Sequence, residues 1–210
     1  MLPFSLAYVT FADYSPRGNS KESQKSQKLV GRLKRGDPKL LTNLATTVLE
    51  REDAAVVRDC LSGSILVPIP RSTPMVPGAI WPSRAICDAL LDAGLADGIV
   101  EGITRATPVT RSATANAKDR PSPLTHFESL ESSFDLLGPQ RLVLVDDVLT
   151  KGSTSAGCAM RASEGVAERE VSVFSVFRTL GFQPNIERVV NPSSGTVIVH
   201  RSGKVFRDDS

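Results

Sequence analysis

The chain has 210 residues, of which 40% are hydrophobic and 23% charged, and its formal net charge is +2. This balance is typical of one globular domain with a real core, and it argues against a protein that is basic over its whole surface. Three scattered cysteines and two histidines argue against a disulfide framework and a structural zinc site. Neither a signal peptide nor an apolar run of about 18 residues is present, so we expect a cytoplasmic protein without a membrane partner.

Positive charge is concentrated near the N-terminus, where residues 17–39 contain eight Lys or Arg. Within this segment, residues 20–35 predict a helix that ends at Gly36. Its cations near one face are Lys21, Lys25, Lys28 and Arg32. Such a basic helix, at 21–35, is usually a solvated face, and the alternative is contact with nucleic acid or another phosphate-rich partner.

The elements then alternate between strands and helices. Residues 6–14 predict a strand, and Asp37 followed by Pro38 predicts the start of an apolar helix. Uninterrupted apolar segments predict parallel strands covered on both faces. These segments lie at 64–70 and 141–145, with further strands expected at 98–105 and 171–177 and helices at 81–95 and 154–168.

The order of these elements predicts an α/β fold, an open and mainly parallel sheet flanked by helices. Residues 1–62 are expected to form an N-terminal extension of strand and helices packed on a core at 63–181. Residues 182–210 are expected to form a C-terminal hairpin or tail that turns at Ser202 and Gly203. The polar segment 106–123 is predicted to be a long loop that is either functional or disordered.

Asp146 and Asp147 follow the apolar strand directly and require an explanation, because adjacent buried carboxylates repel each other. A Walker B strand would need a phosphate loop, yet the Gly203-Lys204 pair has no glycine five positions earlier. A receiver-type acidic pocket would need four more strands in the 63 residues that follow the pair. Ribose recognition remains, since two carboxylates accept from the 2′- and 3′-hydroxyls. The following turn and helix start, residues 150–154, suit a 5′-phosphate.

The segment "VLVDDVLTKGST" resembles the phosphoribosyl-pyrophosphate (PRPP) motif of the type I phosphoribosyltransferases. The resemblance implies that Asp146 and Asp147 hold the ribose hydroxyls. It assigns the 5′-phosphate to Thr150, Lys151, Gly152, Ser153 and Thr154. The segments "ILVPIPRS" and "FSVFRTLG" extend the likeness, which is closest to the competence-protein-F branch and covers residues 65–181. That branch often begins with paired cysteines, which this chain lacks.

The resemblance also implies cations for the leaving pyrophosphate. Pyrophosphate binding is expected from Arg71, Ser72, Arg105 and Arg111. The catalytic candidates are Arg71, Lys118 and Arg120, the latter two in a loop that would close over the site. Phe177 and Arg178 are the candidates for base binding, and His126 is expected to be a packing or capping residue. Mg²⁺ is expected as a cofactor carried by PRPP, with Asp146 and Asp147 as its possible contacts and no site formed by protein ligands alone.

The expected function is therefore a phosphoribosyltransferase, which moves ribose 5-phosphate from PRPP to a nitrogenous base and releases pyrophosphate. The alternative is a catalytically weak PRPP- or nucleotide-binding regulator, or an accessory protein of DNA uptake that associates with nucleic acid. The expected partners are PRPP and a nitrogenous base or nucleotide, with a possible homodimer.

Overall fold

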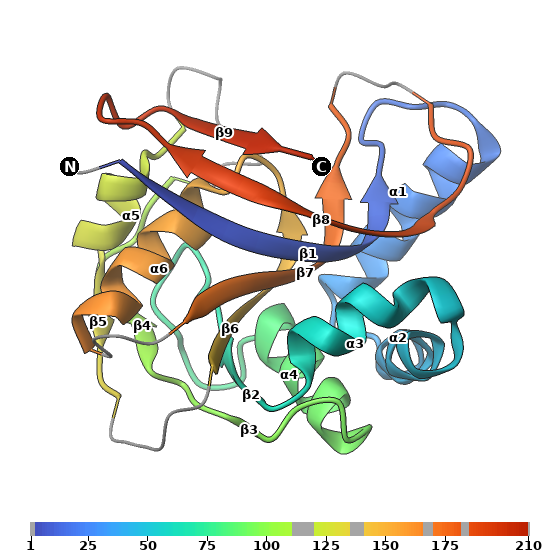
Figure 1. Cartoon of the computed structure of the whole chain (residues 1–210), viewed down its shortest axis with the longest axis horizontal. Coiled ribbons are helices and arrows are strands. Elements are labelled where there is room, and N and C mark those ends of the chain that lie inside the picture. Colours follow the sequence, from blue (N-terminus) through green and yellow to red (C-terminus); the bar gives the residue numbers. More distant parts are fainter. Residues whose placement is uncertain (1–2, 111–119, 135–140, 166–169, 182–184, 210) are drawn as a thin grey trace.

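The computed structural model describes residues 3–110, 120–134, 141–165, 170–181 and 185–209. In this part of the chain the central sheet has seven strands, and Figure 1 shows it running through the middle of the molecule. The spatial order is β3 (Gly98–Ile99), β2 (Ser64–Pro68), β6 (Arg141–Leu149), β7 (Val171–Thr179), β1 (Phe4–Tyr14), β8 (Val190–Val199) and β9 (Val205–Asp208). The pairs from β3 to β1 are parallel, and β8 and β9 are antiparallel additions. The expected mainly parallel α/β sheet is confirmed.

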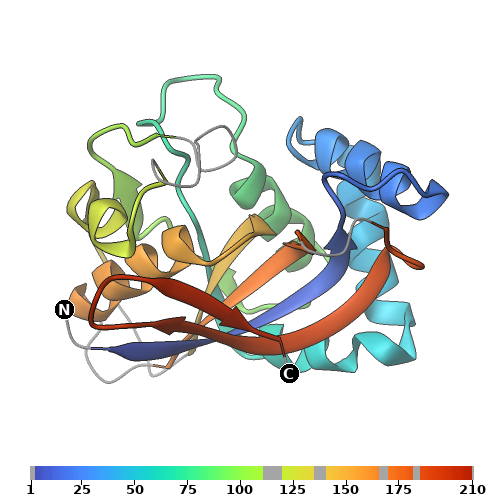
Figure 2. The ribbon, with the colours of Figure 1, turned by 90° about the horizontal axis from the view of Figure 1, so that it is seen from above.

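Helices cover both faces of the sheet, as the view from above shows (Figure 2). One face carries α1 (Lys21–Leu33), α2 (Pro38–Glu50), the short turn η1 (Glu52–Ala54), α3 (Ala55–Leu61) and α4 (Pro82–Asp92). The other carries α6 (Ser153–Gly165), with α5 (Pro123–Glu128) packed on it and the small sheet of β4 (Ile103–Arg105) and β5 (Leu130–Ser132) beside it. No helix in the described ranges combines the length and the apolar character needed to cross a membrane.

The apolar strands are buried on both faces because each faces two hydrophobic cores. In β6, Val143 and Val145 belong to the core beneath α1–α4, whereas Leu142 and Leu144 belong to the core beneath α6. Successive strand residues point to opposite faces, so a strand between two helical layers needs apolar residues at every position. This explains the uninterrupted runs in β2 and β6.

The first strand lies inside the sheet rather than at its edge. Tyr8 is in register with Val173 of β7 on one side and with Gly195 of β8 on the other. The segment 1–62, expected to pack on the core, thus supplies an interior strand together with three of the helices on one face.

Two local expectations differ from the structure. The segment 98–105 forms two strands instead of one, because Ile99 pairs with β2 while Ile103 pairs with β5. Gly102 lies between them, where an added Cβ would overlap the Phe134 ring, so glycine allows Phe134 to pack against the chain here. Helices α3 and α5 and strand β5 were not expected from the sequence.

The helix starts and the C-terminal hairpin agree with the sequence. Asp37 caps α2 by accepting from the backbone N–H of Leu40, and Ser20 caps α1 in the same way. The hairpin of β8 and β9 turns at residues 200–204, with Gly203 at a positive φ of 78°.

Candidate functional site

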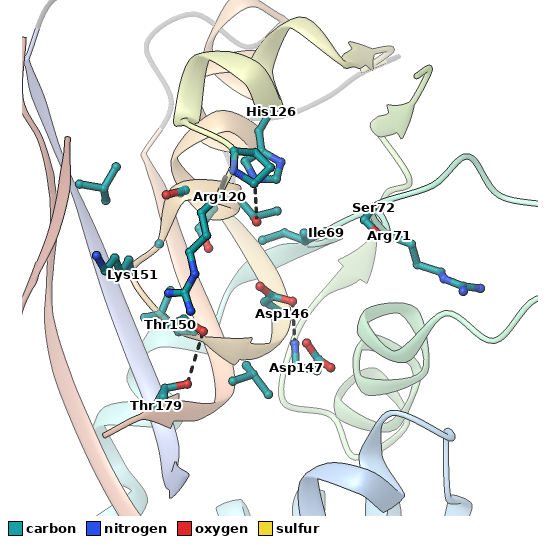
Figure 3. A pocket seen from close by; sticks show the side chains of 18 of the residues that line it. Ile69, Arg71, Ser72, Arg120, His126, Asp146, Asp147, Thr150, Lys151 and Thr179 are labelled. Carbon is teal, nitrogen blue, oxygen red and sulfur yellow. Dashed lines mark hydrogen bonds between the residues drawn. The ribbon is translucent and has the colours of Figure 1, made fainter. Parts of the chain in front are cut away.

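A cavity of about 1200 Å³ lies at the carboxyl ends of the parallel strands. It opens where the strand order reverses, because β3 lies on one side of β2 and β6 on the other. Ligands of open α/β sheets bind at such a point. The cavity brings together most of the predicted residues: Arg71, Ser72, Arg105, Arg120, Asp146, Asp147, Thr150, Lys151, Gly152, Ser153 and Thr154. Figure 3 shows how several of these side chains surround the opening.

The aspartate pair lies within β6, and the expected strand end at residue 145 was wrong. The strand continues to Leu149 because β7 pairs with it as far as the register of Leu149 with Arg178. On the other side, β2 stops pairing at Val145, so the edge of Asp146 and Asp147 faces the cavity. The Asp147 N–H donates to Asp146 Oδ1 at 2.9 Å. Burial, followed by the charge of Asp147, raises the pKa of the Asp146 carboxyl well above its ordinary value.

The loop that follows is shaped for an anion. Gly152 has a φ of +91°, and a Cβ there would lie 2.6 Å from Cγ2 of Val197 in β8. The Ala156 N–H donates to the Gly152 carbonyl at 2.8 Å, which is the first backbone hydrogen bond of α6. The N–H groups at the start of a helix have no partner within it and carry a partial positive charge, so this loop can hold a phosphate.

A buried cation lies beside the start of α6. Arg105 is 4% exposed, and its Nε donates to the Arg71 carbonyl at 2.9 Å while Nη1 contacts Ser129 Oγ. Its Nη2 has no hydrogen-bond partner among the described residues, and the same holds for the buried Ser155 Oγ. Buried polar atoms are normally paired, and both residues line the cavity, so a polar ligand there would lie close to two atoms that lack a partner.

His126 supports this part of the wall. Its Nε2 lies 3.3 Å from Thr154 Oγ1, whereas its buried Nδ1 has no partner in the described part of the chain. Burial, with the nearby charge of Arg105, lowers the pKa of His126 to about 4. The imidazole is therefore neutral at neutral pH, and it positions the Thr154 hydroxyl instead of supplying charge.

The other predicted cations differ in their placement. Arg71 lines the cavity, but its side chain points away from the aspartate pair, and Nη1 donates to the Ile80 carbonyl at 3.0 Å (Figure 3). Ser72 lies next to it, and its carbonyl accepts from the Val109 N–H at 2.8 Å. Arg120 extends into the opening toward Thr150. Arg111 and Lys118 lie outside the described residues.

The structure does not bring the two base-binding candidates to the cavity. Strand β7 extends to Thr179, two residues beyond the expected end, so Phe177 and Arg178 lie inside the sheet. Phe177 is 3% exposed in the core beneath α1–α4. Arg178 Nε is 2.7 Å from Asp13 Oδ1, and Nη1 donates to Ser193.

Several cavity residues were not among the site residues predicted from the sequence, and they come from both ends of the chain. The N-terminal ones are Tyr14, Pro16, Arg17 and Lys34, and the C-terminal ones are Gly203, Lys204, Val205 and Phe206. Arg207 is placed just behind the loop, and its guanidinium donates to the carbonyls of Leu149, Thr150 and Thr179 at 3.2, 3.0 and 2.9 Å. No local pattern signals such a role, because 57 positions separate Arg207 from Thr150.

The acidic groups suit a metal that arrives with its ligand. Within the described ranges, no cluster of three or more His, Cys, Asp or Glu side chains could hold a metal ion. Mg²⁺ is commonly bound through one or two carboxylates together with substrate phosphates and water. Asp146 and Asp147, side by side on the cavity wall, fit that pattern.

Comparison with models of known protein families gives no match, and a search among curated proteins finds no significant match either.

Proposed function

We propose that this protein is a phosphoribosyltransferase that transfers ribose 5-phosphate from PRPP to a nitrogenous base. The observation that carries the proposal is the convergence of the Asp146–Asp147 pair, the loop 150–154 and the cations Arg105 and Arg120 on one cavity. This set supplies acceptors for sugar hydroxyls, a helix start for a phosphate, and positive charge for a second anion. The core would thus be of the type I phosphoribosyltransferase kind.

In the proposed complex the 5′-phosphate binds the N–H groups at the start of α6 and the hydroxyls of Ser153 and Thr154. The two ribose hydroxyls donate to Asp146 and Asp147. The pyrophosphate then lies toward Arg105, whose Nη2 would gain the partner it lacks among the described residues. Arg120, whose side chain extends into the same opening, is assigned to this anion as well.

The reaction breaks the bond between the anomeric carbon and the pyrophosphate oxygen, and the bonding electron pair leaves with pyrophosphate. A ring nitrogen of the base donates its lone pair to form the new C–N bond, and a proton on that nitrogen passes to solvent. Positive charge develops on the ribose, so the protein acts mainly by positioning the fragments and neutralising the leaving group. Mg²⁺ bound with PRPP would add charge neutralisation on the pyrophosphate oxygens.

Titration calorimetry with PRPP, with and without Mg²⁺, tests the proposal. Micromolar binding that strengthens with Mg²⁺, followed by pyrophosphate release in a screen of bases, is the expected result. Absence of PRPP binding to the folded protein would refute it. Binding without release for any base would instead favour the alternative, a PRPP-binding regulator.

A further inference from the structure

The cavity extends past the sugar-phosphate region to the ends of β1 and α1. We call this part the acceptor region, which consists of Tyr14, Pro16, Arg17, Lys34, Ile80 and Pro82. Tyr14 packs against the core beneath α1–α4, and Lys34 and Pro82 stand at the end of α1 and the start of α4. The phosphate loop begins α6, on the other side of the sheet (Figure 2). The ribose held at β6 would therefore have its 5′-phosphate on one side and the acceptor region on the other.

The acceptor region combines apolar walls with unpaired positive charge. Ile80 is 51% exposed although it is a large apolar side chain, and Tyr14 presents a half-buried ring nearby. Arg17 and Lys34 are both exposed, and neither takes part in an ion pair with the residues that the structure describes. Lys34 is near enough to the aspartates that its charge favours the ionised form of Asp146. Apolar side chains that line the same cavity as two cations suit a planar ring that carries an anionic group.

We infer that the acceptor region binds the base, and that the base is a nitrogen heterocycle bearing a carboxylate. This inference rests on the proposed transferase function. Arg105 and Arg120, the cations assigned to pyrophosphate, approach from the α6 side. A nitrogen nucleophile must reach the anomeric carbon from the side that pyrophosphate leaves free, which is the side of Tyr14 and Lys34. Arg17 and Lys34 would then hold the carboxylate and orient the ring.

The test compares heterocycles that differ by one carboxylate. Binding of orotate against uracil, and of nicotinate against nicotinamide, would be measured by calorimetry at saturating ribose 5-phosphate. The carboxylated member of at least one pair should bind about tenfold or more tightly than its neutral partner, as expected for a charge-assisted contact. The double variant Arg17→Gln, Lys34→Gln should abolish that preference. The control is the triple variant Lys21→Gln, Lys25→Gln, Lys28→Gln, which removes charge from the same segment at positions that do not line the cavity. This variant should keep the preference for the carboxylated heterocycle.

Two results would overturn the inference. One is equal affinity for the charged and neutral members of both pairs. The other is a double variant that loses affinity for PRPP when no heterocycle is present, because Arg17 and Lys34 would then belong to the pyrophosphate. Failure of the transferase proposal is recognised separately, as a wild-type protein that does not bind PRPP, while the heterocycle titrations still report on the acceptor region.

Discussion

Asp13 and Arg178 form an ion pair inside the sheet, with 2.7 Å between Oδ1 and Nε and with side chains that are 5% and 11% exposed. Asp13 also accepts from Asn191 Nδ2 at 2.7 Å, so the pair connects β1, β7 and β8. Removing one partner of a buried ion pair destabilises the fold strongly, because the other charge stays buried without compensation. The arrangement assigns Arg178 a structural role in place of the base contact expected from its position after an apolar strand.

Arg178→Met should therefore destabilise the protein by about 3–5 kcal/mol, since Asp13 would remain buried and charged. Urea denaturation would measure the free energy of unfolding. At a temperature where the variant is folded, its affinity for PRPP should equal that of the wild type. A variant that is as stable as the wild type but binds the base less tightly would instead show that Arg178 contacts the base.

The double variant Asp146→Asn, Asp147→Asn should lower the affinity for PRPP at least about 100-fold, because the hydrogen bonds from both ribose hydroxyls to carboxyl oxygens are lost. It should also be more stable than the wild type at neutral pH. The raised pKa of Asp146 means that the folded state favours the protonated carboxyl. That stabilisation is present below the ordinary pKa and is lost as the pH rises through the raised value. Calorimetry and denaturation at pH 4 and 7 would check both effects, and unchanged PRPP affinity would contradict the ribose role.

The lowered pKa of His126 should make the folded protein less stable in acid. Its pKa is lowered to about 4, so between that value and the ordinary value of about 6.5 the unfolded chain binds a proton that the folded protein does not. The folded state should lose about 2 kcal/mol from this group between pH 7 and pH 5. The variant His126→Gln should show a correspondingly flatter dependence of the unfolding free energy on pH. Parallel curves for the two proteins would disprove the assignment.

Gly152→Ala should weaken both the fold and the phosphate loop. The substitution combines a φ of +91° with a Cβ 2.6 Å from Val197, so the loop must shift. We expect a cost of about 1–3 kcal/mol and a loss of affinity for PRPP. Gly63→Ala is the matched control, because Gly63 has a φ of +67° but no atom within 4 Å of an added Cβ. The control should lose stability by about 1 kcal/mol and keep its affinity.

Arg120→Gln should slow turnover more than it weakens binding. Its side chain extends from the rim into the opening, where it can neutralise charge that develops as pyrophosphate leaves. We expect kcat to fall about 10- to 100-fold with a smaller change in KM. A variant with unchanged kcat would place Arg120 on a solvated rim with no part in the reaction.

Much of the sheet and the centre of the site could be predicted from the sequence, because their signals are local. Apolar runs identified β2 and β6, and the Asp146–Asp147 pair with its loop identified the cavity edge. The ends of strands were predicted less well. Both β6 and β7 continue past the apolar residues, since backbone pairing with a neighbouring strand holds polar residues in extended form.

The remaining site residues depend on contacts between distant segments. No local signal separates Lys34 from the other cations of the basic segment, and only the packing of the end of α1 brings it to the cavity. Arg207 donates to the Thr150 carbonyl of the loop, although it lies in β9, at the edge of the sheet opposite β3. Such roles are set by strand order, which no short pattern in the chain encodes.

The interior position of β1 also has a consequence for how the protein folds. Tyr8 pairs with Val173, 165 positions later, and Leu6 pairs with Val197, 191 positions later. During synthesis the first strand must therefore remain unpaired until almost the whole chain has left the ribosome. Closing such long loops slows folding, and an unpaired apolar strand favours aggregation in the meantime. Chains truncated before β8 should leave β1 as an open edge and accumulate in the insoluble fraction.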